Sequence, residues 1–149
     1  NKFVHISHKH YFCFLLIVFR AYRYVSTKVS SNNEIRKLSG AGNFYGLHAT
    51  RSYVNVYHNT IYAGGSALSA ALHFSDGLST TNTQIKHNIC VGASTNLNTS
   101  YAVYTTNNNC IKPSDGHFLD HNIYYTTGNN LFYAAGNIQT LEQWKEITF

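Results

Sequence analysis

Charged residues are scarce in this 149-residue sequence, and it has no long apolar run. Lys, Arg, Asp and Glu together make up 11% of the chain, whereas an average soluble domain has about 25%. The longest apolar stretch, residues 11–19, is well short of the roughly 20 residues that a membrane-spanning helix needs. The composition therefore argues against a helix bundle, which is rich in Ala, Leu, Glu and Lys, and we expect no membrane span.

Cysteine is also scarce. The three cysteines have no metal-binding spacing and cannot all pair, so neither a disulfide scaffold nor a zinc site is predicted. Cys90 lies in an apolar stretch, where we expect a small buried side chain; the others are Cys13 and Cys110. The residues themselves predict no cofactor and no metal ion.

The formal net charge of +5 does not predict a nucleic-acid-binding protein. Five of the eleven basic residues lie in the first thirty positions, and from residue 31 onward six basic residues balance six acidic ones. A nucleic-acid-binding face would instead show a basic stripe with aromatic residues between the charges. We therefore expect no nucleic-acid partner.

The abundant residues are those of strands and polar turns. The sequence has 17 Asn, 12 Tyr and 10 Gly, together with many Thr and Ser. Tyr and Thr favour strands, and Asn, Gly and Ser favour the turns between them. An all-β domain is predicted, and the chain is long enough for one core but not for two.

The segment 1–31 differs in composition from the rest, because its first thirty residues contain one Asn, no Gly and no acidic residue. Its basic start and short apolar stretch resemble a secretory signal, but Arg20 follows where a small-residue cleavage site is expected. Three interpretations stay open: a degenerate signal, an amphipathic cap over the β domain, or a segment unrelated to the fold. The segment is left unassigned, and residues 32–149 form the predicted domain.

The predicted domain contains an imperfect repeat of about thirty residues. The stretches VYHNTIY (56–62), IKHNICV (85–91) and LDHNIYY (119–125) carry a His-Asn pair at equivalent places, and Asn33 is an earlier member of this series. A fainter series alternates with it: YGLHA, AALHF, YAVYT and LFYAA, beginning at residues 45, 70, 101 and 131. Each unit then has at least two short strands and no room for a helix, which predicts a β-solenoid.

In a solenoid, equivalent residues of successive units stack at the strand spacing of about 4.8 Å. We expect Asn59, Asn88 and Asn122 to form a structural ladder, in which each amide donates and accepts hydrogen bonds along the stack. Because Asn tolerates the left-handed backbone conformation, we also expect these asparagines to adopt it at a bend.

The phrases HNTIY, KHNIC and DHNIYY resemble repeats of right-handed parallel β-helix proteins of the pectate-lyase-like superfamily. Residues 118–149 are similar to the end of the β-helix in many secreted, carbohydrate-associated members. The resemblance implies a right-handed parallel β-helix of about four coils, the C-terminal portion of a protein that is secreted or at the cell surface. It also implies polysaccharide lyases or hydrolases, some with Ca²⁺, although Asp76, Asp115 and Asp120 form no acidic motif of that family.

The last residues predict a short helix. Thr140 is followed three residues later by Gln143, the capping-box pattern of a helix start. We expect a helix from about Leu141 that lays Trp144 and Ile147 over the last coil. For Trp144, the role of capping anchor is favoured over that of a sugar-stacking residue.

Two positions before each ladder asparagine stand Tyr57, Lys86 and Asp120, which strand alternation places outward in one column. They are the candidate catalytic residues, for proton abstraction from a uronate with Lys86 as the base. A solvated column, whose Lys–Asp pair contributes about 0–1 kcal/mol, is favoured over this catalytic interpretation.

Directly before the ladder asparagines stand His58, His87 and His121. Stacked imidazoles raise the question of a Zn²⁺ or Cu²⁺ site. Ligands along a straight column do not surround an ion, however, so a polar edge at the bend is predicted and a metal site is not.

The tyrosines of the strands suit stacking on sugar rings, and the candidate substrate-binding residues are Tyr57, Tyr124 and Trp144. We expect a secreted segment that binds an extracellular polysaccharide and derives from a polysaccharide lyase or glycoside hydrolase; whether it is an enzyme stays open. The alternative is a non-catalytic structural or adhesion solenoid. Open coil ends would allow self-association.

Overall fold

The computed structural model describes residues 18–20, 28–37, 40–50, 54–75, 83–107, 111–112 and 118–148. Most of these residues form strands, arranged in three parallel sheets with one short C-terminal helix, so the prediction of a mostly β chain is confirmed. Within these ranges no helix is both long and apolar enough to cross a bilayer.

The three sheets are built from strands that lie far apart in the sequence. Sheet A contains, in spatial order, β1 (Val18–Arg20), β4 (Phe44–Thr50), β7 (Ser69–Ser75), β10 (Ser100–Thr105), β13 (Phe132–Ala134) and β14 (Asn137–Ile138). Sheet B contains β11 (Phe118–Asp120), β8 (Gln84–Lys86), β5 (Val54–Tyr57) and β2 (Lys28–Ser31). Sheet C contains β12 (Ile123–Thr126), β9 (Ile89–Ser94), β6 (Thr60–Gly65) and β3 (Glu34–Lys37).

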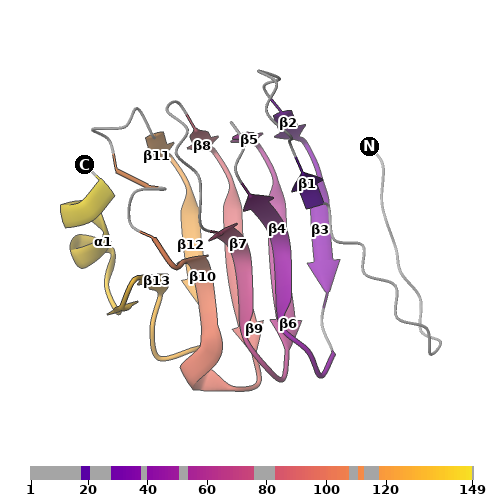
Figure 1. Ribbon diagram of the computed structural model, residues 1–149, viewed down its shortest axis with the longest axis vertical. Coiled ribbons are helices and arrows are strands. Elements are labelled where there is room, and N and C mark those ends of the chain that lie inside the picture. The colour runs from indigo at the N-terminus through magenta and orange to yellow at the C-terminus, as the bar shows by residue number, and fades with distance from the viewer. Residues whose placement is uncertain are drawn as a thin grey trace.

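The chain visits sheets B, C and A in turn, and we call each such passage of three strands a unit: β2–β4, β5–β7, β8–β10 and β11–β13. Strands of successive units pair in parallel, and only β14 is antiparallel to its neighbour, among the strands described. Figure 1 shows the units side by side along the molecule. This arrangement is compatible with a parallel β-helix.

The core lies between the sheets and consists of columns of apolar side chains. In sheet B, Val56, Ile85 and Leu119 are in register and at most 4% exposed, which is the inward orientation that an outward column of Tyr57, Lys86 and Asp120 requires. Sheet A contributes a second column, formed by Leu47, Leu72, Val103 and Phe132. Sheet C contributes a third, formed by Ile61, Cys90 and Tyr124. Burial of the Cys90 thiol raises its pKa; Cys13 and Cys110 lie outside the described residues.

Helix α1 (Leu141–Thr148) covers the core at the end formed by the last unit (Figure 1). The predicted capping box is confirmed, because the Gln143 N–H donates to Thr140 Oγ1 at 3.2 Å and the Thr140 N–H donates to Gln143 Oε1 at 3.2 Å. Trp144 is 1% exposed and stacks on Phe132, with ring centroids 4.2 Å apart. Strand β14 covers the outer edge of β13 in sheet A.

The corner between sheets C and A is held by hydroxyl groups. Ser94 Oγ donates to the Ala67 carbonyl at 2.8 Å, and Ser100 Oγ accepts from the Ser94 N–H at 3.0 Å. One unit later, Thr126 Oγ1 donates to the Ser100 carbonyl at 3.0 Å. A Cβ at Gly92 would collide with the backbone of Tyr101, so this close approach of two strands requires glycine.

The sheets also include residues upstream of the composition boundary at residue 32. Strand β2 pairs with β5, and β1 pairs with β4, although both precede that boundary. Backbone pairing uses N–H and C=O groups that every residue but proline supplies, so a change in composition need not end a sheet. The rest of the segment 1–31 lies outside the described residues.

Candidate functional site

The His-Asn pairs form the corner between sheets B and C. In each unit one strand ends directly before the pair and the next begins directly after it, as with β5 and β6 around His58 and Asn59. Each stretch that looks like one strand in the sequence is therefore two strands with a bend. The asparagine lies at the bend and not within a strand, which explains its presence in an otherwise strand-like sequence.

The asparagines of this corner form a continuous hydrogen-bonded column, which we call the asparagine column: Asn33, Asn59, Asn88 and Asn122. The Oδ1 of Asn88 accepts from the Asn59 N–H at 2.9 Å and from Asn59 Nδ2 at 3.0 Å. Asn122 Oδ1 does the same for Asn88, at 2.9 and 3.0 Å. Asn59 and Asn88 are each 1% exposed, so the column satisfies polar groups that water does not reach.

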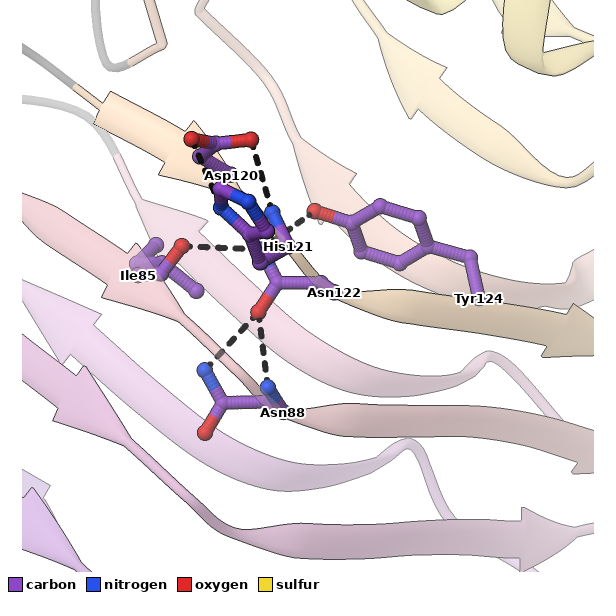
Figure 2. A network of polar contacts seen from close by, with 6 residues as sticks. All are labelled: Ile85, Asn88, Asp120, His121, Asn122 and Tyr124. Atoms are coloured by element: carbon purple, nitrogen blue, oxygen red, sulfur yellow. Dashed lines mark hydrogen bonds and ion pairs between the residues drawn. The ribbon is translucent and has the colours of Figure 1, made fainter.

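The amide groups also bind the backbone across the corner. Nδ2 of Asn88 donates to the carbonyls of Val56 and Lys86, both at 2.9 Å. At the end of the column, Asn122 Nδ2 donates to the Ile85 carbonyl at 2.8 Å and to the Tyr124 hydroxyl at 3.1 Å, as Figure 2 shows. The column thus joins strands of successive units as well as the bends themselves.

The residue with the left-handed backbone is the histidine and not the asparagine, so our prediction for the asparagines was wrong. The φ angles of His58, His87 and His121 are 55°, 57° and 53°, and Asn32, before Asn33, has 55°. His is one of the few side chains enriched in this conformation. The asparagine needs an orientation in which its amide reaches the next unit, and the residue before it makes the turn.

The three histidines stack on the exposed side of the corner. The rings of His58 and His87 are nearly parallel, with centroids 5.0 Å apart, whereas those of His87 and His121 are 5.1 Å apart and tilted by 30°. Stacked rings direct their edges outward in a row. Among the residues that the structure describes, no group of three or more His, Cys, Asp or Glu is arranged to hold a metal ion.

The candidate catalytic residues are neighbours in register on the outer side of sheet B. Tyr57 pairs with Lys86, and Lys86 pairs with Asp120. The Asp120 carboxylate is directed at His121: its Oδ2 lies 2.8 Å from Nδ1, and its Oδ1 accepts from the backbone N–H at 2.8 Å (Figure 2). The structure therefore brings the three together as a column, with the carboxylate turned to the corner.

The other two polar groups of that column are also engaged beside it. Lys86 Nζ lies 5.5 Å from the centroid of the Phe118 ring, close enough for a cation–π contact. The Tyr57 hydroxyl donates to Gln84 Oε1 at 3.4 Å. Three polar groups directed to three different partners do not converge on one point where a reacting atom would sit.

Tyr124 and Trp144, expected as sugar-binding candidates, lie in the interior. Tyr124 packs edge-on against Phe132 at 4.9 Å and against Trp144 at 6.5 Å. Burial, with the nearby Cys90, raises the pKa of the Tyr124 hydroxyl. Trp144 is 1% exposed and offers no face to a ligand, and the partly buried Tyr124 packs against the core, so both contribute to the cap at its end.

The outer side of sheet A carries six aromatic residues, which we call the aromatic cluster: Tyr45, His48, His73, Tyr101, Tyr104 and Tyr133. His48, His73, Tyr104 and Tyr133 are equivalent residues of four neighbouring strands, β4, β7, β10 and β13. Tyr45 stacks on His73 at 4.0 Å, and Tyr101 contacts Tyr104 at 5.5 Å. The cluster therefore crosses all four units on one face.

Packing within the aromatic cluster changes the acidity of its members. Burial lowers the pKa of His48, which disfavours its charged form. Burial, followed by repulsion from neighbouring tyrosines, raises the pKa of Tyr101 and Tyr104. The Tyr101 hydroxyl lies 2.9 Å from the Asn98 carbonyl and 3.1 Å from Asn137 Oδ1, so it is held by the protein.

Sequence reasoning noted the tyrosines and the second series of strands but did not combine them. When the stretches of that series are aligned on their inward apolar residue, the next residue is His48, His73, Tyr104 or Tyr133. In the last stretch, LFYAA, this position comes one residue earlier than in the other three. This alignment was the available signal. It was obscured because the column changes from His in the first two strands to Tyr in the last two, and because the two neighbouring inward positions vary in size.

A second exposed surface lies on the outer side of sheet C, at the end of the last units. Ile123 is 62% exposed, Tyr125 58% and Ile89 40%. Phe118, on the adjoining strand of sheet B, is 47% exposed. These side chains lie on or next to β11 and β12, the last described strands of sheets B and C.

No family model, no curated protein and no solved structure matches this chain.

Proposed function

We propose that this chain is a segment of a right-handed parallel β-helix of about four coils, related to the pectate-lyase-like superfamily. Three parallel sheets that each take one strand per unit, joined by a buried asparagine column, support the proposal. Right-handedness follows from the general preference of connections between parallel strands of one sheet. The four units, which begin with β2 upstream of residue 32, then correspond to the β-helix of a secreted or cell-surface protein.

The function that we infer for it is binding of an extracellular polysaccharide by the aromatic cluster. The observation that supports this function is the row of equivalent residues on the outer side of sheet A: His48, His73, Tyr104 and Tyr133. His73 is 7% exposed and stacks on Tyr45, whereas His48, Tyr104 and Tyr133 are partly exposed. Tyr and His that are partly exposed present an apolar body and a polar tip, which is the combination that sugar rings and their hydroxyls require. Three strand spacings make the row about 14 Å long, so it fits an extended chain.

Binding is favoured over catalysis because Tyr57, Lys86 and Asp120 do not converge on a common point. The Asp120 carboxylate contacts His121, and Lys86 lies over Phe118. Incubation of the folded protein with pectate, alginate or a glycosaminoglycan, with and without Ca²⁺, should give no rise in ultraviolet absorbance from unsaturated uronate products. A rise that disappears in Lys86→Ala would make this column a lyase site and overturn the preference.

The binding experiment is native gel electrophoresis of the whole chain in gels that contain dissolved polysaccharides. Retardation by at least one polysaccharide is expected, and the double variant Tyr104→Ala/Tyr133→Ala should remove it. Tyr62→Ala is the matched control, because Tyr62 is a partly exposed strand tyrosine of sheet C and lies outside the aromatic cluster. Equal loss in the control would contradict the proposed location.

A non-catalytic structural or adhesion solenoid is the second candidate, favoured by the exposed apolar side chains on β11 and β12. A strand edge with apolar neighbours invites pairing with another chain, and Ile123 and Tyr125 are each more than half exposed. Sedimentation velocity over a range of concentrations tests this function. Self-association that is removed by Ile123→Lys would support it, whereas a concentration-independent monomer would argue against it.

A further inference from the structure

We propose that the aromatic cluster selects an uncharged polysaccharide, whose hydroxyl groups hydrogen-bond to the Tyr104 and Tyr133 hydroxyls. This inference rests on the proposed function and names the chemical class of the ligand. It differs from the uronate-rich ligands that the family resemblance implies.

The first argument is the charge of the face. Strands β4, β7, β10 and β13, which carry the cluster, contain no Lys, Arg, Asp or Glu. The only charged residue in a strand of sheet A is Arg20 of β1, at the edge of the sheet. These four strands thus supply no Lys or Arg to pair with a carboxylate, whose burial without a cation is costly, whereas an uncharged hydroxylated chain needs no such partner.

The second argument is the direction in which the rings lie. Tyr104 stacks on Tyr133 with centroids 4.6 Å apart and planes 13° apart, and His48 stacks on His73 at 4.3 Å. His73 and Tyr104, between these two pairs, are tilted by 57°. Within each stacked pair the rings cover one another's inner faces, which leaves mainly ring edges for a ligand. The contact offered to a ligand is thus a line of ring edges and polar tips, which favours hydrogen bonding to hydroxyls.

The third argument is the hydrogen bonding of the Tyr104 and Tyr133 hydroxyls, compared with that of the other tyrosines of the cluster. The Tyr101 hydroxyl is bound to Asn98 or Asn137, and Tyr45 is hydrogen-bonded to Asn43. Within the part of the chain that the structure describes, no hydrogen bond from the Tyr104 or Tyr133 hydroxyl to a protein group is found. Both side chains are partly exposed, so these two hydroxyls are available to a ligand.

Isothermal titration calorimetry of the whole chain tests the inference with neutral probes and one anionic probe. The neutral probes are soluble galactomannan, xyloglucan and arabinoxylan, and the anionic probe is polygalacturonate. Binding to a neutral probe should change less than about twofold between about 50 and 500 mM NaCl, because no ion pair is screened. Tyr104→Phe and Tyr133→Phe should each weaken binding by about 2- to 10-fold, the effect of one lost hydrogen bond.

Tyr125→Phe is the matched control, since it removes an exposed hydroxyl from sheet C and leaves the cluster intact. It should bind as the unchanged protein does. All variants keep their rings, and circular dichroism with a thermal melt should show an unaltered fold.

The outcomes separate the two proposals. Binding to polygalacturonate that disappears at high salt overturns the uncharged class and leaves polysaccharide binding standing. Binding to a neutral probe that Tyr104→Phe and Tyr133→Phe leave unchanged overturns the role of the two hydroxyls. Absence of binding to all four probes, together with no retardation in the gels, overturns both proposals.

Discussion

The asparagine column and the row of His48, His73, Tyr104 and Tyr133 in the aromatic cluster each take one equivalent residue from every unit. The two differ in how far their polar groups are exposed to solvent. In the column, Asn59 and Asn88 are each 1% exposed and their amides bind one another. In the cluster, the rings of Tyr104 and Tyr133 stack while both side chains remain partly exposed. The same stacking therefore stabilises the fold at one corner and supplies a binding surface on another face.

The asparagine column and the aromatic cluster differ because the amides of the column form their hydrogen bonds within the protein, whereas exposed hydroxyls of the cluster can form theirs with water. A buried amide without its partner costs free energy, so the column has little freedom to bind anything else. An outward hydroxyl is satisfied by water and can exchange that water for a ligand. Substitutions should accordingly affect stability in the column and binding in the cluster.

The largest effect is expected for Asn88→Ala. It removes the acceptor of the Asn59 N–H and the donor to the Val56 carbonyl, both buried, and the donor to the partly buried Lys86 carbonyl. We expect a loss of about 3 kcal/mol in the free energy of unfolding, measured by urea denaturation. Tyr104→Phe, in the cluster, should stay within about 0.5 kcal/mol. Similar losses for the two variants would remove the distinction between column and cluster.

A smaller effect is expected at the left-handed residue of the corner, where His87 has φ 57°. His87→Val places a β-branched side chain in a conformation that such residues avoid, and it should destabilise the fold by about 1–2 kcal/mol. His87→Gly adopts the same backbone without that strain, so it should be close to neutral. Thermal unfolding of both variants checks this pair, and a loss that is equal for Gly and Val would mean that the imidazole stack, and not the backbone, matters.

The smallest effect concerns pH and the cluster. Burial lowers the folded-state pKa of His48 below its unfolded value of about 6.5. Above about pH 6.5, His48 is neutral in both the folded and the unfolded state, so its lowered pKa does not change the free energy of unfolding. As the pH falls from about 6.5 to the lowered pKa, the unfolded state takes up the proton first, so stability decreases, and below that pKa no further loss occurs.

Urea denaturation between about pH 8 and pH 5 measures this effect against His48→Gln, which should show a shallower decline. Ile123→Gln is the control, because it replaces an exposed side chain of sheet C with a group that does not titrate, and it should follow the pH dependence of the unchanged protein. A steeper decline in His48→Gln would show that the histidine is stabilised, and not destabilised, by protonation.

Much of the fold was predictable from short patterns. The abundance of Asn, Tyr and Gly indicated a β chain, and Thr140 with Gln143 indicated the start of α1. The inward orientation of Val56, Ile85 and Leu119 followed from alternation within each strand. These are local properties, determined by neighbours a few residues apart, and a single sequence contains them in full.

The left-handed position and the aromatic cluster were not predicted, for two different reasons. The bend is shared by His and Asn, and both residue types tolerate a positive φ, so the pattern alone did not say which of them turns the chain. The cluster depends on register between strands that are 25 to 31 residues apart, His48 with His73 and His73 with Tyr104. Register is set by the packing of whole units.

The sequence by itself determined that this chain forms short strands with polar bends, repeats a His-Asn pair, and ends in a capped helix. Only the tertiary structure decided which side chains meet across units: asparagines inside one corner, and tyrosines with histidines on the outer side of sheet A. The physical reason is that alternation within a strand decides whether a side chain faces inward or outward, whereas its neighbours depend on stacking between strands that the sequence separates.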